Sequence, residues 1–211
     1  MTRLSWNATG ERFFETGLDR GVLYPKTGTP VVWNGLTGVD EDGADGAVAY
    51  YIDGRPFLYL PSPKEYSATL KAYTFPDEFL ELIGFAEATS GMYLDSQMGD
   101  MFDLSYRTSV GNDLDGISHA YKIHLIYNAT ATPAAKSYES LSDSINPIEL
   151  SFALQAVPVK VTGFRPTAHV IIDSRSVAPA KLSSLEDELY GTATTNPSIP
   201  TAQAVFDLLS A

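Results

Sequence analysis

The three histidines are the side chains of this sequence best suited to acid–base or metal chemistry. His119 and His124 are five residues apart on an expected strand over residues 119–127. Because successive side chains of a strand alternate between its two faces, these rings point in opposite directions and do not share a metal. His169 falls on a different expected strand, over residues 167–173. We therefore interpret all three as structural histidines.

Two acidic loops are the next candidates for chemistry. An EF-hand frame that starts at Asp40 would place Ala44 at the fifth position, Asp45 where glycine is required and Tyr51 where the bidentate glutamate belongs, so the frame fails. A calcium hairpin of another type stays open for residues 39–46, but a solvated loop explains them better. The same holds for residues 111–116, which are typical of a hairpin turn. We predict no catalytic, cofactor-binding or metal-binding residues.

Composition narrows the class of protein further. The sequence contains no G-x-S-x-G, G-x-x-x-x-G-K or H-E-x-x-H motif, and its lack of cysteine excludes disulfides and Cys-ligated metal sites. A hydrolase with two carboxylates stays open only because 26 acidic residues always offer pairs. The formal net charge of −12 excludes a protein that coats duplex DNA. We expect a soluble chain without a membrane span or signal peptide, and not an enzyme.

Period-2 alternation of apolar and polar residues dominates the sequence and predicts a mainly β fold. Pro158 lies inside the strand expected over residues 148–162 and has no backbone N–H to donate to a neighbouring strand. We therefore expect a bend, a bulge or an edge position there. Helices are expected over residues 76–83, 179–191 and, weakly, 201–209. The expected strands cover residues 66–74, 102–110, 119–127, 148–162 and 167–173, with shorter ones at 31–33, 47–52 and 57–60.

The 12 tyrosines suit a protein whose strands pack together or pack against other subunits. Cross-strand packing within one subunit is the simplest explanation. Exposed rings of this kind also suit a monomeric β-sandwich that binds a ligand or carbohydrate, so that function stays open. The tyrosines on or beside expected strands are Tyr50, Tyr51, Tyr59, Tyr66, Tyr73, Tyr106, Tyr121 and Tyr127.

Several strings in sequence order resemble the major tail proteins, or tail tube proteins, of long-tailed siphovirus bacteriophages, especially those of actinobacteria. The resemblance begins with Trp6 and Gly10, covers roughly residues 4–191 and is weaker beyond Gly191. The strings that carry it are residues 15–25, 33–36, 71–79, 104–108, 111–113, 121–127, 158–163 and 185–191.

This resemblance implies a β-sandwich or barrel of the tail tube type with one flanking C-terminal helix. Residues 1–191 would form that single domain, and residues 192–211 a C-terminal extension of loop and short helix. The chain would form homohexameric rings that stack into a hollow tube for phage DNA. Tape-measure, tail-tip and tail-terminator proteins would be its partners, in a virion assembled in the host cytoplasm.

The tube implied by the resemblance needs contacts between subunits and a lumen that DNA can traverse. We assign those contacts to the arm at residues 2–14 and to a long loop at residues 35–47. Deletion of residues 39–46 is expected to block tube growth while leaving the monomer folded. An acidic lumen wall would repel phosphates, so that DNA passes without specific binding.

Overall fold

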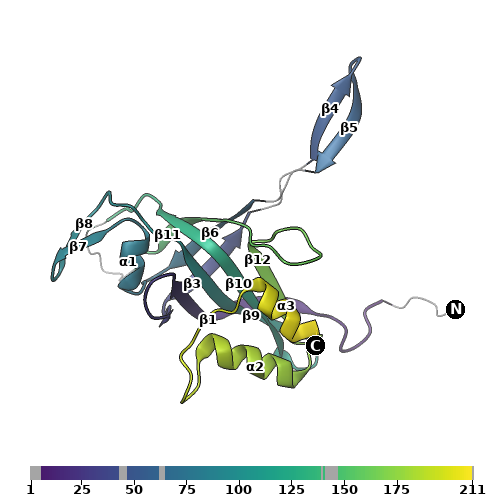
Figure 1. The fold of residues 1–211 in the computed structure, drawn as a ribbon. Helices are drawn as coiled ribbons and strands as arrows, with labels where there is room; N and C mark the ends of the chain where they lie inside the picture. The colour runs from purple at the N-terminus through teal and green to yellow at the C-terminus, as the bar shows by residue number, and fades with distance from the viewer. Residues whose placement is uncertain (1–5, 43–46, 62–64, 139, 141–146, 211) are drawn as a thin grey trace.

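The computed structural model describes residues 6–42, 47–61, 65–138, 140 and 147–210. Its main feature is one large, curved, antiparallel sheet (Figure 1). The order of its strands is β2-β1-β9-β10-β11-β6-β3, with β12 paired to β10. This confirms the mainly β class. The bounds are β1 (Phe14–Pro25), β2 (Val31–Val32), β3 (Leu36–Glu41), β6 (Tyr66–Ala72), β9 (Phe102–Asn112), β10 (Gly116–Pro133), β11 (Leu150–Ala156) and β12 (His169–Asp173).

Strands β9 and β10 form the hairpin that the turn at residues 111–116 predicts, and this hairpin lies near the middle of the sheet order. Asn112 closes the turn, because its side-chain oxygen accepts hydrogen bonds from the backbone N–H groups of Leu114 and Asp115. Strand β10 is longer than expected and is interrupted at Asn128, where φ is +49°. Before this residue β10 pairs with β12, and after it with β11. One long strand therefore joins two parts of the sheet.

The strand expected over residues 148–162 is shorter in the structure. Strand β11 ends at Ala156, and the N–H of Val157 then donates to the carbonyl of Asn128. Beyond Pro158 only an isolated bridge between Val159 and Thr167 continues the pairing. The proline therefore follows the end of the strand and does not bend it.

The prediction of a long loop over residues 35–47 is wrong for its first half, which forms strand β3. This strand pairs with β6, and Val39 packs against the main core. Residues 43–46 lie outside the described part of the chain. Deletion of residues 39–46 would remove half of β3, so it would damage the fold and does not isolate an assembly contact.

Strand β1 has no counterpart among the expected strands. Its pairing with β9 shifts register between Thr16 and Leu18 and again between Asp19 and Val22. Gly17 and Arg20 have positive φ at these two irregularities. Such bulges break the alternation of side chains, so the sequence of β1 carries no period-2 signal.

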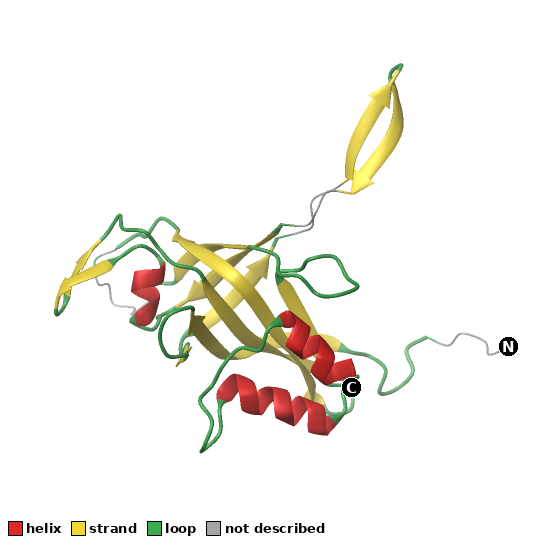
Figure 2. Cartoon of the chain, in the orientation of Figure 1, coloured by secondary structure: helices red, strands yellow, loops and turns green. Residues whose placement is uncertain are grey.

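Two layers of core lie on the two faces of the sheet. The concave face surrounds helix α1 (Glu78–Leu82), whose Phe79 is fully buried. The other face is covered by α2 (Pro179–Tyr190) and α3 (Ala202–Ser210), which lie side by side in Figure 2. The C-terminal extension thus contributes a helix to the second core. The α2 residues buried there are Leu182, Leu185 and Leu189.

Two small hairpins lie outside the main sheet. One consists of β4 (Ala47–Ile52) and β5 (Arg55–Pro61), and the other of β7 (Ala86–Thr89) and β8 (Met92–Leu94). Figure 1 shows the first projecting far from the sheet and the second beside α1 on another side of the molecule. None of the described helices is long and apolar enough to cross a membrane.

Gly84 allows the chain to turn after α1, and its replacement by alanine tests this role. Its φ is +87°, and an added Cβ would lie 2.6 Å from the backbone oxygen of Gln97. Gly84→Ala is therefore expected to destabilise the fold by about 1–3 kcal/mol, through backbone strain and overpacking. Urea unfolding measures this change.

A matched control for that prediction is Gly38→Ala. An added Cβ at Gly38 would meet its nearest neighbour, the Lys71 side chain, at an ordinary 3.9 Å. This change is expected to alter stability by less than about 1 kcal/mol. Equal effects at the two glycines would contradict the close approach of residues 84 and 97.

Candidate functional site

The main cluster of exposed apolar side chains outside the sheet lies on the β4–β5 hairpin. Tyr51 is 65% exposed and Phe57 is 71% exposed, and Tyr50, Ile52 and Leu58 are also exposed. We call these five residues the apolar tip. Paired residues Tyr50 and Leu58 face one side, whereas Tyr51 faces the other. Among the described side chains of this hairpin, exposed apolar groups therefore lie on both faces.

A tight turn of Asp53 and Gly54 joins the two strands of this hairpin. Their φ values are +49° and +72°, the sign that a type I′ turn requires at both central positions. The hairpin follows β3 and precedes β6, which are paired neighbours at one edge of the main sheet. It is thus an outgrowth of the connection between two core strands. Both expected strands, 47–52 and 57–60, are confirmed, although they do not join the main sheet.

A second exposed apolar surface surrounds the β7–β8 hairpin. Met92, Tyr93 and Leu94 are each close to half exposed, and Met98 is 97% exposed. Methionine adapts well to varied partner surfaces because its side chain is flexible and polarisable. This surface and the apolar tip lie on different sides of the molecule (Figure 1).

Of the N-terminal arm expected at residues 2–14, the structure describes residues 6–13 and the first residue of β1. Trp6 is 77% exposed and Phe13 is 48% exposed. Arg175 lies over the Phe13 ring at 4.9 Å, and the arm is further tied down where the Gly10 N–H donates to Asp113. The arm is thus another surface with large uncovered apolar rings.

Glu41, His124 and His169 meet on the concave face of the sheet, and we call them the histidine cluster. They come from β3, β10 and β12, and one ligand atom from each lies within 4.8 Å of the others. The Nδ1 of His124 lies 3.1 Å from the Nε2 of His169. The Nδ1 of His169 lies 3.6 Å from a carboxylate oxygen of Glu41. The sequence gives no signal for this cluster, because only the strand order brings the three residues together.

A chain of hydrogen bonds lies behind His124. Its Nε2 is 3.1 Å from the hydroxyl oxygen of Thr108, and that hydroxyl donates to Glu15 at 2.6 Å. Lys122 donates to the other oxygen of Glu15. Burial raises the pKa of Glu15, but hydrogen bonds from Lys122 and Thr108 outweigh this effect and lower the pKa overall. The hydrogen-bond chain therefore ends on an ionised carboxylate.

Burial also sets the protonation of His124 itself. It lowers the pKa of His124 to about 4, and the neighbouring His169 acts in the same direction. His124 is therefore neutral at pH 7. Because the Thr108 hydroxyl donates to Glu15, it can only accept from His124, which places the single ring proton on Nε2. The lone pair of Nδ1 then points toward His169.

The remaining histidine, His119, is paired with an aspartate of its own turn. The Nδ1 of His119 lies 2.8 Å from an Asp115 carboxylate oxygen in the β9–β10 turn. His119 and His124 thus have different surroundings, as their opposite faces predict. The loop at residues 111–116 uses Asn112, Asp113 and Asp115 in bonds within the chain, in agreement with the interpretation as a turn.

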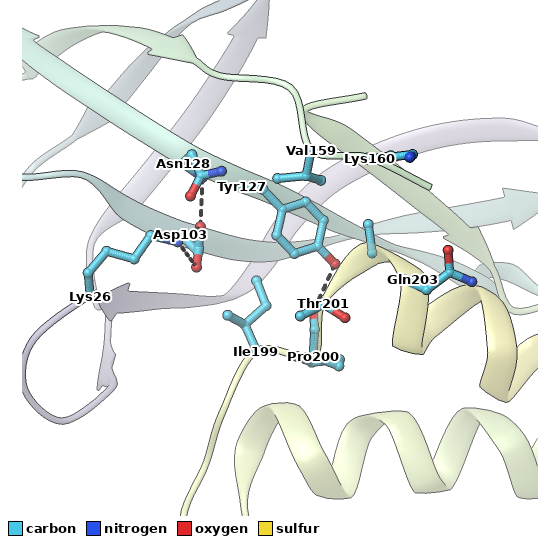
Figure 3. Close-up of a pocket in the computed structure, with 11 residues that line it drawn as sticks. Lys26, Asp103, Tyr127, Asn128, Val159, Lys160, Ile199, Pro200, Thr201 and Gln203 are labelled. Atoms are coloured by element: carbon cyan, nitrogen blue, oxygen red, sulfur yellow. Dashed lines mark hydrogen bonds and ion pairs between the residues drawn. The ribbon is translucent and has the colours of Figure 1, made fainter. Parts of the chain in front are cut away.

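A pocket of about 320 Å³ lies between the sheet and α3 (Figure 3). Its buried Asp103 accepts hydrogen bonds from Lys26 at 2.7 and 2.6 Å and from the N–H of Asn128 at 2.7 Å. The hydroxyl of Tyr127 donates to the carbonyl of Pro200 at 3.1 Å. These bonds join the residue after β1, strands β9 and β10, and the segment before α3, so this pocket is a structural junction.

Removal of the Lys26 ammonium tests that junction. Lys26→Met leaves Asp103, whose side chain is 8% exposed, without its ionic partner. We expect a loss of about 1–3 kcal/mol of stability in urea unfolding. Lys71→Met is the control, because Lys71 and Asp40 are also 2.6 Å apart but their side chains are 38% and 63% exposed. Its expected cost is below about 1 kcal/mol, and equal costs would contradict the structural role of Asp103.

Comparison with known proteins gives structural similarities only. No protein-family model and no curated protein matches the sequence. The chain is similar to one in the anti-feeding prophage cap (AFP tube terminating cap), with a TM-score of 0.39, 14% identity, and coverage of 82% of this chain and 96% of that chain. It is also similar to a chain of the PVC sheath/tube terminator of an extracellular contractile injection system, with a TM-score of 0.37, 15% identity, and coverage of 81% and 99%.

Proposed function

We propose that this chain is the major tube subunit of a long-tailed phage tail, which forms six-membered rings that stack into a hollow tube. The observation that carries the proposal is the apolar tip, whose exposed side chains lie on both faces of the hairpin. The sequence resemblance to siphovirus major tail proteins supports the same function. The role is structural and not catalytic.

A hairpin such as β4–β5 needs a partner. A two-stranded hairpin without a packed face has little stability in water, and exposed apolar patches favour association. Tyrosine and phenylalanine are also enriched in the buried centres of protein interfaces. Between Ala47 and Pro61 the only charged residues are Asp53 and Arg55. We infer that a neighbouring subunit covers the apolar tip.

The position of the second apolar surface supports an assembly that repeats. The apolar tip and the β7–β8 hairpin lie on different sides of one molecule (Figure 1). A contact between two different surfaces is heterologous, so it closes into a ring or continues as a filament. A tube of stacked rings needs both kinds of heterologous contact. Contacts within a ring close it, and contacts between rings continue as a filament.

The charge of the chain suits a tube that conducts DNA. Each subunit carries a formal charge of −12, and a wall of like charge repels the phosphates of passing DNA. In this proposal DNA passes without specific binding, and the tape-measure, tail-tip and tail-terminator proteins set the length and the two ends of the tube. Replacement of lumen acids by lysine would retard DNA without preventing assembly.

Light scattering and negative-stain electron microscopy of the purified chain test this function. Over a series of rising concentrations we expect particles that grow from monomers into rings or tubes. A strictly monomeric species at every concentration, both alone and with a tail-tip complex added as nucleus, would contradict the proposal. That result would favour the alternative, a monomeric β-sandwich that binds a ligand or carbohydrate.

A further inference from the structure

We propose that the histidine cluster of Glu41, His124 and His169 binds one divalent transition-metal ion of the zinc type. This inference does not depend on the proposed function. Two imidazoles and one carboxylate form a donor set that zinc and its neighbours in the first transition row prefer. A fourth position would remain for water.

The spacing of the donor atoms fits such an ion. Two nitrogens on a tetrahedral zinc, each at a bond length of about 2.0–2.1 Å, lie about 3.3 Å apart. The Nδ1 of His124 and the Nε2 of His169 are 3.1 Å apart. Oxygens of Glu41 lie 3.9 Å from the Nδ1 of His124 and 3.6 Å from the Nδ1 of His169. One ligand atom from each of the three residues lies within 4.8 Å of the others, so side-chain adjustment would place all three around one ion.

The surroundings of the cluster have the features that support metal ligands. The Thr108–Glu15 chain behind His124 orients the ring and makes it a better donor. The hydroxyl of Tyr106 donates to Glu41 at 2.9 Å and fixes the carboxylate. The buried hydroxyl of Tyr66, whose ring lies against His169, finds no hydrogen-bond partner of good geometry among the described residues.

An ion can reach this position from solvent. The Glu41 side chain is one-third exposed, whereas those of His124 and His169 are only 7% and 9% exposed. An open pocket of about 400 Å³ between β1 and β3 is lined by Glu41, His124 and Thr108. The two imidazoles are thus held in the wall of the sheet, and the carboxylate lies on the solvent side.

Titration calorimetry of the chelator-treated, full-length monomer with zinc chloride tests the site. We expect one zinc per chain, released by EDTA, with no comparable binding of magnesium or calcium. Cobalt(II) in the same site is expected to show the visible absorption of a tetrahedral ion. At a zinc concentration of about 100 times the dissociation constant, the melting temperature should rise by about 5–10 °C. No saturable binding of zinc or cobalt would overturn the proposal.

Variants locate the ion. His169→Gln is expected to abolish binding, and Glu41→Gln, at the exposed side of the cluster, serves if the first variant does not fold. Thr108→Val should weaken zinc binding by about 10–100-fold without removing a ligand. His119→Gln is the matched control, because His119 pairs with Asp115 outside the cluster. Unchanged zinc affinity in His169→Gln and Glu41→Gln would place the ion elsewhere and overturn the proposal.

Discussion

Tyr51→Ser combined with Phe57→Ser is expected to prevent tube formation at concentrations where the unchanged chain assembles, while leaving the monomer folded. These two rings are the most exposed members of the apolar tip. Burial of each against a neighbouring subunit would contribute about 1.5–3 kcal/mol. Their joint loss should therefore raise the concentration needed for assembly by about 100-fold or more. Sedimentation of assembled material over a concentration series measures this shift.

The fold itself should tolerate that double change. Exposed substitutions away from strained or buried features usually alter stability by less than about 0.5 kcal/mol. Ile117→Ser is the control for assembly, because Ile117 is 63% exposed but lies near the turn of β9 and β10. It should assemble like the unchanged chain. Normal assembly of the double variant would contradict the role of the apolar tip.

Phe79→Ala is expected to cause the largest loss of stability among single changes. The Phe79 ring is fully buried, and its centroid lies 4.5 Å from Trp33, 5.5 Å from Phe102 and 5.1 Å from Phe152. Truncation to alanine removes this apolar surface and leaves a cavity at the centre of the main core. The expected loss is about 3–5 kcal/mol, or a fall of about 6–20 °C in the melting temperature.

Denaturant unfolding followed by circular dichroism measures the effect of that truncation. Leu80→Ala on the same helix is the comparison, since Leu80 is only partly buried against the core. Its cost should be clearly smaller. A loss of less than about 1 kcal/mol for Phe79→Ala would show that α1 does not plug the concave face of the sheet.

Strand β6 could be predicted from sequence because its side chains alternate without interruption. In β6 the buried residues are Tyr66, Ala68, Leu70 and Ala72, the face that the pattern predicts. Strand β1 could not be found in this way, because its two bulges reset the alternation. Strand β3 was hidden by its polar, glycine-containing sequence, since its place at the sheet depends on backbone pairing with β6.

The candidate sites were less accessible to sequence reasoning. The Asp53–Gly54 turn between two apolar runs is a strong hairpin signal. The pairing of β4 with β5 could therefore have been predicted from the sequence. That this hairpin stands away from the sheet depends on the pairing of β3 with β6. The histidine cluster depends on three strands that are far apart in sequence. Alternation along one strand places His119 and His124 on opposite faces, but it cannot show that His169 lies next to His124.

The most direct test of the central claim is a cryo-electron microscopy reconstruction of the particles that the purified chain forms. We predict six subunits per ring, a hollow lumen, and the apolar tip of each subunit buried against a neighbouring subunit. Tubes in which Tyr51 and Phe57 remain exposed to solvent would contradict the claim that this hairpin carries assembly. Failure to form any ordered particle, even on a tail-tip nucleus, would contradict the tube function itself.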